Sequence, residues 1–184
     1  MSFIKPLFVT LCAAGMLQPG MAAAQQSVPA APATEELAAL PASLKDVKWA
    51  TDKTPNLKAK YYIYLISASW CGPCSRLMPQ IVKAYKTDMK EGKLVEVILT
   101  ACEQRKGDVP AYLEKYGAGF PGIHITAPEV QRFAGFDRND MRKGIPFVVI
   151  CDRNGNVLDK GHGAFGNWKE TIKKDIEAKK AAKN

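Results

Sequence analysis

The chain has 184 residues, of which 47% are hydrophobic and 24% are charged. This apolar content excludes a disordered or collagen-like chain and is enough for one domain of ordinary size. Lys and Arg outnumber Asp and Glu by 26 to 18, which gives a net charge of +8. Five cysteines are too few, and the chain is too long, for a disulfide-scaffold miniprotein. The positions of the cysteines therefore matter more than their number.

The first 24 residues have the features of a secretory signal peptide. Lys5 supplies a basic start, residues 7–17 form an apolar run, and a stretch of alanines ends at Ala24. We therefore predict cleavage after Ala24 and a periplasmic or secreted protein, in a compartment where thiols can be oxidised. The alternative is an uncleaved segment that anchors the chain, although the apolar run is shorter than the roughly 18 residues that span a bilayer.

Residues 25–45 are rich in Ala and Pro, a composition typical of a flexible tether that ends in a short N-terminal segment. Residues 46–184 are expected to form a single domain. Its predicted elements are, in chain order, a strand at 61–69, a helix at 71–90, a strand at 94–101, a helix at 109–116, a loop at 117–122, an extended segment at 123–126, a short helix at 128–134, a strand at 145–151, a turn at 153–156, a strand at 157–161 and a helix at 167–182.

The first strand and helix of this domain indicate the fold class. Tyr61–Ser69 is apolar on both faces, as expected for a strand in the middle of a covered sheet. In the helix that follows, Leu77 and Ile81 recur at helical spacing, and Pro79 is expected to kink it. A strand–helix–strand unit implies parallel pairing with a right-handed crossover. The later elements then complete an α/β domain, with a mixed central sheet and helices on both faces.

The sequence Trp70-Cys71-Gly72-Pro73-Cys74 lies where the first strand meets the first helix. Cys71 is placed at the helix N-terminus, where free N–H groups and the helix dipole favour a thiolate. Cys74 lies one turn later and can reach the same sulfur, and Pro73 fits the first turn. Cys71 would attack a substrate disulfide, and Cys74 would then resolve the mixed disulfide.

Half of a zinc site is the alternative for two cysteines at this spacing. A structural zinc ion needs four ligands. The sequence has no second pair of this kind and only two histidines, His124 and His162. We therefore expect neither a metal ion nor an organic cofactor. Thiol exchange needs no histidine base, so both histidines are expected to be structural or exposed.

Three stretches resemble the thioredoxin superfamily, and within it the tryparedoxin and nucleoredoxin branch. Residues 64–79 (YLISASWCGPCSRLMP) resemble the strand, cysteine motif and following proline of that branch, and residues 94–104 resemble its second strand and acidic turn. Residues 144–147 (GIPF) resemble the loop of the superfamily that carries a cis-proline. The resemblance extends over about residues 57–176 and implies the thioredoxin fold.

The resemblance also implies roles for single residues. Cys71 matches the exposed nucleophile of the family and Cys74 its resolving thiol. Pro146 matches the cis-proline beside the disulfide, where the backbone of Ile145 would pair with an extended substrate segment; the alternative is an ordinary edge-strand proline. The residues that the resemblance implies in substrate binding are Trp70, Gly72, Pro73, Ile145 and Pro146.

One departure from the family concerns the proton on Cys74. Thioredoxin has a buried Asp six residues before its first cysteine, and this chain has Leu65 at that place. The proton must therefore leave by another route, through water or through Glu103. The residues between the two cysteines, Gly72 and Pro73, are those of thioredoxin itself. This resemblance implies a reduction potential at the reducing end of the family range, about −270 mV.

Cys102 and Cys151 end the second and third core strands. Cys102 is expected on the active-site side of the sheet, either as an accessory redox thiol or, as we favour, as a small packed residue. The third strand runs antiparallel to the first in this fold, so Cys151 is expected at the opposite end. Bridged cysteines need Cα atoms within about 7 Å, so both are predicted to be free thiols.

Together these features predict an extracytoplasmic enzyme that reduces disulfides in other proteins. We expect a monomer that receives electrons from a membrane thiol reductant. One alternative is an oxidase or isomerase that runs the exchange in the opposite direction, and another is a non-enzymatic binding module whose disulfide is structural. The lysines of the last helix alternate with acidic residues and no basic motif is interleaved with aromatics, so nucleic-acid binding is not expected.

Overall fold

A computed structural model describes residues 43–183 of the chain. The predicted signal peptide and most of the predicted tether lie outside the described residues. Leu44 and Val47 are both buried against the core, so the chain contributes to the domain from slightly before the predicted boundary at residue 46. Within residues 43–183, no helix has the length and apolar character needed to cross a membrane.

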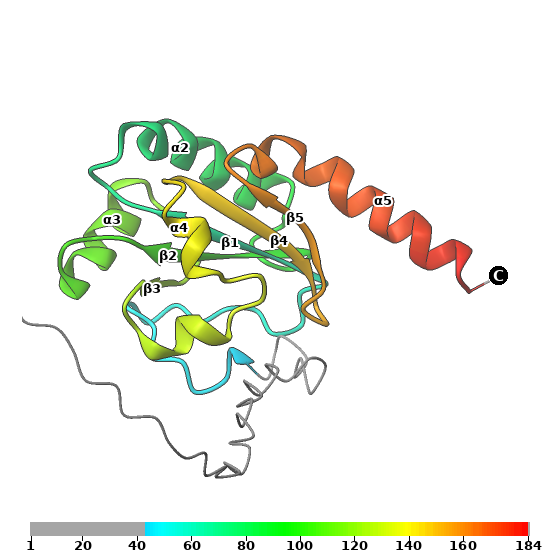
Figure 1. Cartoon of the computed structure of the whole chain (residues 1–184), viewed down its shortest axis with the longest axis horizontal. Coiled ribbons are helices and arrows are strands. Elements are labelled where there is room, and N and C mark those ends of the chain that lie inside the picture. The colour runs from blue at the N-terminus through cyan, green and yellow to red at the C-terminus, as the bar shows by residue number, and fades with distance from the viewer. Residues whose placement is uncertain (1–42, 184) are drawn as a thin grey trace, which may run out of the picture. The chain divides into compact units, whose positions relative to one another are not determined.

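Five strands form one mixed sheet in the order β3-β2-β1-β4-β5 (Figure 1). They are β1 (Tyr61–Ser67), β2 (Val95–Ala101), β3 (Gly122–His124), β4 (Phe147–Asp152) and β5 (Val157–Gly161). The central strand β1 pairs in parallel with β2 and antiparallel with β4. Every residue of β1 and of β2 is buried. Strand β1 is apolar on both faces, as expected for a central strand, whereas β2 carries the buried polar residues Glu96 and Thr100 on one face.

The register of these strands brings three chain segments to one edge of the sheet. Ser67 at the end of β1 lies opposite Ala101 at the end of β2. Because β4 is antiparallel, its first residue, Phe147, pairs with Ile66 at the same end. The loops that follow β1 and β2 and the loop that precedes β4 therefore meet there, and the candidate site is built from them.

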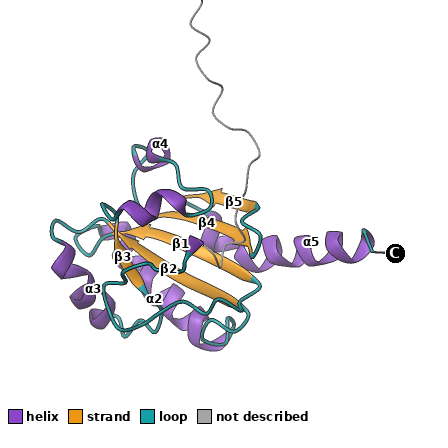
Figure 2. Cartoon of the chain, turned by 90° about the horizontal axis from the view of Figure 1, so that it is seen from below, coloured by secondary structure: helices purple, strands orange, loops and turns teal. Residues whose placement is uncertain are grey.

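Helices cover both faces of the sheet. Helix α2 (Gly72–Thr87), helix α3 (Val109–Lys115) and the start of α5 (Trp168–Ala181) pack on one face. The 3-10 helix η2 (Pro128–Arg132) packs on the other, and in Figure 2 α4 (Arg138–Met141) also lies on the side away from α2. Two further 3-10 helices, η1 (Lys106–Asp108) and η3 (Ala164–Asn167), precede α3 and α5.

The side chains of β1 alternate between the two faces with the period of a strand. Ile63 and Leu65 lie in the cluster that contains Met78 of α2. Tyr64 lies in the opposite cluster and stacks on Phe133 with ring centroids 4.9 Å apart. This two-sided core holds β1, and with it the loop that follows, in a fixed place.

The predicted thioredoxin fold is confirmed, with differences in the bounds and number of its elements. Strand β4 begins at Phe147 rather than at residue 145, and the short helix α4 was not predicted. Strand β1 ends at Ser67 rather than at residue 69, because the chain turns there to enter α2. The segment predicted only as extended contains a fifth strand, β3, which pairs in parallel with β2 at the sheet edge. Helix α2 runs from Gly72 to Thr87 and is therefore shorter at both ends than predicted. Pro79 lies inside it.

Candidate active site

Cys71 and Cys74 form a disulfide at the N-terminus of α2, with Cα atoms 5.2 Å apart. Cys71 is the N-cap residue of the helix, and its Sγ accepts a hydrogen bond of 3.3 Å from the backbone N–H of Cys74. Cys71 is 7% exposed and Cys74 only 1%. Gly72 and Pro73 are exposed between them. Cys71 is therefore the more accessible of the two cysteines.

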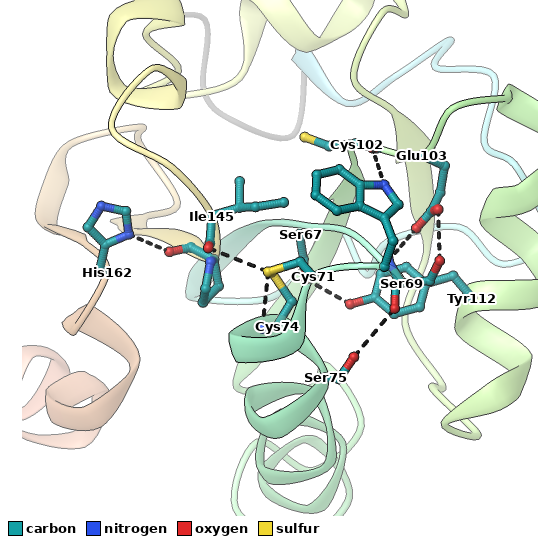
Figure 3. Close-up of a disulfide and its surroundings, with 12 residues drawn as sticks. Ser67, Ser69, Cys71, Cys74, Ser75, Cys102, Glu103, Tyr112, Ile145 and His162 are labelled. Atoms are coloured by element: carbon teal, nitrogen blue, oxygen red, sulfur yellow. Dashed lines mark hydrogen bonds between the residues drawn. A yellow bond between two sulfur atoms is a disulfide. The ribbon is translucent and has the colours of Figure 1, made fainter.

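The loop before β4 lies directly beside this disulfide. The Ile145–Pro146 peptide bond is cis, as predicted. The Ile145 carbonyl oxygen lies 3.5 Å from Cys71 Sγ, and the Ile145 side chain packs against the small apolar cluster of Ala68, Cys71 and Cys74. The structure thus brings together two segments that are 74 residues apart in the sequence. Figure 3 shows the disulfide and this loop facing each other.

Trp70 is the most exposed large hydrophobic side chain of the described residues, at 62%. Its indole Nε1–H donates to the Cys102 carbonyl oxygen at 3.2 Å. The ring is therefore fixed at one edge while most of its surface remains exposed, next to Cys71 in the chain. A side chain held in this way offers apolar contact area to a partner at little cost in conformational entropy.

Glu103 is buried at the same end of the sheet. Its Oε1 accepts from the backbone N–H of Ser69 at 2.6 Å, and its Oε2 accepts from the Ser69 hydroxyl at 2.9 Å. Both carboxylate oxygens are thus engaged by the turn between β1 and Cys71. The contacts of Glu103 join it to this turn and not to Cys74, so its predicted role in taking up the Cys74 proton stays a prediction.

The two histidines have different surroundings. His124 is buried, with one ring nitrogen 2.8 Å from the Glu103 carbonyl oxygen and the other 2.9 Å from Thr126 Oγ1, so it is structural. His162 is exposed, but its Nδ1 lies 2.7 Å from the Pro146 carbonyl oxygen. His162 therefore contacts the loop beside the disulfide, a role that its sequence position does not indicate.

Cys102 and Cys151 are free thiols at opposite ends of the sheet. Cys151 pairs with Tyr62 at the start of β1, whereas Cys102 follows the end of β2. Burial, with a smaller contribution from the Glu103 carboxylate, raises the pKa of Cys102 to about 11. The Cys102 side chain packs against the apolar cluster of Ala68, Cys71 and Cys74. These features favour the small packed residue over the accessory thiol.

Further hydroxyls support the turn that carries the cysteines. Ser75 in the first turn of α2 donates through its Oγ to the Ser69 carbonyl oxygen at 3.4 Å. The buried hydroxyls of Ser67 and Tyr112 lie 2.7 Å apart and tie β1 to α3. No pattern in the sequence indicates these contacts. Within residues 43–183, no three or more His, Cys, Asp or Glu side chains are grouped so that they could hold a metal ion.

Residues 59–157 match the model of a family described as thioredoxin-like. The chain belongs to the thioredoxin-like family. Among curated relatives, the nucleoredoxin of Xenopus laevis is 23% identical over 110 residues, which are 60% of this chain and 26% of that protein. The thiol-disulfide oxidoreductase ResA of Geobacillus thermodenitrificans is 25% identical over 135 residues, 73% of this chain and 72% of that one.

A solved structure gives a similar result. The thiol:disulfide interchange protein of the thioredoxin family from Chlorobium tepidum is 28% identical to this chain, with a TM-score of 0.50. The match covers 64% of this chain and 80% of that one. The chain spans only about a quarter of the length of the first nucleoredoxins it matches, 26% and 27%. The likeness to nucleoredoxins is thus confined to one thioredoxin-like part of those longer proteins.

Proposed function

We propose that the protein is a thiol-disulfide oxidoreductase that reduces disulfides in other proteins. The observation that carries the proposal is the Cys71–Cys74 pair at the N-terminus of α2, beside the backbone of Ile145. The relatives named thiol-disulfide oxidoreductase and thiol:disulfide interchange protein support this reaction class. Cys71 is the proposed nucleophile and Cys74 the proposed resolving thiol.

The reaction begins with the reduced pair. The Cys71 thiolate attacks one sulfur of a substrate disulfide, that bond breaks, and the other substrate sulfur leaves as a thiolate. Cys74 then attacks Cys71 Sγ, the mixed disulfide breaks, and the second substrate thiolate leaves. Two electrons pass to the substrate, whose thiolates take up protons. The protein is left oxidised, with the newly formed Cys71–Cys74 disulfide.

The helix terminus supplies the electrostatic part of this mechanism. The first N–H groups of α2 have no partner within the helix and favour a negative charge at its start. Cys71 stands at the N-cap and its Sγ already accepts from the N–H of Cys74. A thiolate at this position is stabilised where it must react, so Cys71 is nucleophilic near neutral pH.

The proton of Cys74 has no buried acid at the place where thioredoxin carries one. That position is Leu65, which is 1% exposed and packed in the core. Both oxygens of Glu103 accept hydrogen bonds from Ser69. Water is therefore the acceptor that we propose for this proton, in preference to Glu103.

The substrate would lie along the loop before β4. An extended segment can pair with the backbone N–H and C=O of Ile145, in the manner of strand addition. Trp70 would add apolar contact, and the exposed Gly72 and Pro73 would leave the approach to Cys71 open. These main-chain contacts suit polypeptide disulfides of varied sequence, so disulfide-containing proteins are the proposed substrates.

The setting of the reaction is part of the proposal. The features of residues 1–24 favour a periplasmic or secreted enzyme. The enzyme would act as a monomer and would be reduced again by a membrane thiol reductant. The opposite direction, disulfide formation or isomerisation, would require a more oxidising pair, so the midpoint potential of Cys71–Cys74 separates the two directions.

Turnover and potential together test this function. The purified protein should catalyse reduction of insulin disulfides by dithiothreitol, and Cys71→Ser should abolish that activity. Cys151→Ser, which changes a buried thiol at the far end of the sheet, is the matched control and should keep it. An active Cys71→Ser would overturn the mechanism. A potential well above the roughly −200 mV of glutaredoxins would reverse the direction.

A further inference from the structure

His162 lies just after β5 and contacts the segment beside the disulfide at two points. Its Nδ1 is 2.7 Å from the Pro146 carbonyl oxygen. Its ring meets that of Phe147 edge-on, with centroids 5.6 Å apart and planes at 87°. The imidazole thus contacts the two residues that follow Ile145.

The hydrogen bond fixes the chemical form of this contact. A carbonyl oxygen can only accept, so the proton lies on Nδ1 and His162 is the donor. The bond holds the Pro146 carbonyl and thereby the plane of the peptide that leads into Phe147. Phe147 is in turn held by pairing with Ile66 in β1. With its C-terminal side held at both points, the loop can present Ile145 in one orientation.

The disulfide lies on the other side of the same loop. The Ile145 carbonyl oxygen is 3.5 Å from Cys71 Sγ, and Figure 3 shows the loop between the disulfide and His162. Within residues 43–183, no hydrogen bond joins His162 to either cysteine. His162 therefore cannot act on the sulfur directly, and any effect on the reaction must pass through the loop.

We propose that His162 is a positioning residue that holds the backbone of Ile145 ready to pair with an extended polypeptide substrate. The inference rests on the proposed function and adds that recognition of the substrate, rather than reactivity of Cys71, depends on this histidine. Small thiol reagents need no pairing with Ile145, so they should be indifferent to it. Disulfide-containing peptides should depend on it.

Two substitutions separate the hydrogen bond from the ring contact. His162→Phe keeps an aromatic ring against Phe147 but has no donor for Pro146. His162→Asn carries an amide N–H at nearly the place of Nδ1 and can restore the bond without the ring. Asp159→Asn changes a polar side chain of β5, the strand that ends just before His162, and serves as the control.

The first measurement is steady-state reduction of a disulfide-containing peptide. We expect His162→Phe to raise KM about tenfold with kcat within about twofold, and His162→Asn to restore KM to within about threefold. The rate of Cys71 alkylation by iodoacetamide in the reduced protein should stay within about twofold in both variants. An unchanged peptide KM in His162→Phe, or an equal loss of alkylation rate, would overturn the inference.

The second measurement does not depend on turnover. Amide hydrogen exchange over residues 142–147 should be about tenfold faster in His162→Phe than in the wild type, and near the wild-type rate in His162→Asn. Unchanged exchange would show that the loop does not need the histidine. A wild type that reduces no disulfide refutes the proposed function alone, because the exchange experiment still tests the positioning of the loop.

Discussion

Glu103 holds Ser69 at two atoms, its backbone N–H at 2.6 Å and its hydroxyl at 2.9 Å. Ser69 stands two residues before Cys71, in the turn where the chain leaves β1 and enters α2. Because Glu103 follows β2, this pair of hydrogen bonds ties the turn to the neighbouring strand. The place of the N-cap sulfur thus depends on a carboxylate from another segment of the chain.

Replacing this carboxylate should therefore destabilise the domain and disturb the reaction. Hydrogen bonds to a charged acceptor contribute about 1.5–3 kcal/mol, and Glu103→Ala leaves the Ser69 N–H without its partner. We expect Glu103→Ala to lower the free energy of unfolding by about 2–3 kcal/mol and to reduce kcat/KM. Ser69→Ala keeps the backbone bond and should cost less. Urea unfolding of both variants checks the order, and an equal loss in the two would contradict it.

Cys74→Ser should convert the enzyme into a trap. Without the resolving thiol, the mixed disulfide between Cys71 and a substrate can be released only by external thiols. Non-reducing electrophoresis after incubation with a disulfide-containing protein should show the covalent complex. A reductant should cleave its mixed disulfide and release the two proteins. The double variant Cys71→Ser/Cys74→Ser should form none. A complex of equal yield in the double variant would place the reactive sulfur elsewhere.

Trp70→Ala should reduce recognition of protein disulfides with little change in stability. The indole is 62% exposed and is held by one hydrogen bond to Cys102, so its removal leaves no large cavity. We expect kcat/KM for a protein disulfide to fall about tenfold. The melting temperature should change by no more than about 2 °C. Trp70→Phe should restore part of the activity, and a wild-type kcat/KM in Trp70→Ala would remove the indole from substrate contact.

Cys102 should resist alkylation under conditions that label the reduced active site. With a pKa of about 11, only about one thiol in a thousand is a thiolate at pH 8. Brief treatment of the reduced protein with iodoacetamide, followed by peptide mass spectrometry, should therefore modify Cys71 and leave Cys102 intact. Denaturation before labelling should make both react. Rapid modification of folded Cys102 would revive its interpretation as an accessory thiol.

The stability of the domain should fall in acid partly through Asp152. Burial alone would raise the pKa of this carboxyl, but hydrogen bonds from Lys179, Asn156 and Asn154 together hold the pKa below its ordinary value of 3.8. Ionisation is thus favoured in the folded state. The resulting stabilisation is present above that ordinary value and is lost as the pH falls through the lowered pKa.

Asp152→Asn tests this contribution. At pH 7 the variant should lose about 1–3 kcal/mol of stability, because it weakens the hydrogen bonds at the β4–β5 turn and the contact with Lys179. The difference between wild type and variant should shrink toward pH 3. Urea unfolding midpoints at several pH values measure it. A difference that does not depend on pH would show that the charge of Asp152 is not its source.

The parts of the site that the sequence predicts are those marked by local patterns. Cys71 at a helix start follows from a strand pattern, two cysteines and a proline within a few residues. The directions of the second and third core strands, parallel and antiparallel to the first in this fold, predict which end of the sheet carries Cys102 and which carries Cys151. The cis form of Pro146 follows from the resemblance of the four residues around it and not from any local rule.

The parts that the sequence does not predict are contacts between distant segments. Ser69 and Glu103 are 34 residues apart, and His162 contacts a backbone oxygen 16 residues earlier. Because every residue has a backbone carbonyl oxygen, a hydrogen bond to that atom cannot be inferred from the identity of the residue that carries it. Strand β3 was recognised only as extended, because three residues are too few to show a period.

The distance in sequence between the two halves of the site has a consequence for the unfolded chain. Cys71 and Cys74 are three residues apart and can meet without any tertiary structure, whereas Ile145 reaches them only when β4 has joined β1. A disulfide between the two cysteines can therefore form in a chain that has not yet folded. Under the proposed function, recognition of a protein substrate through Ile145 requires the folded domain.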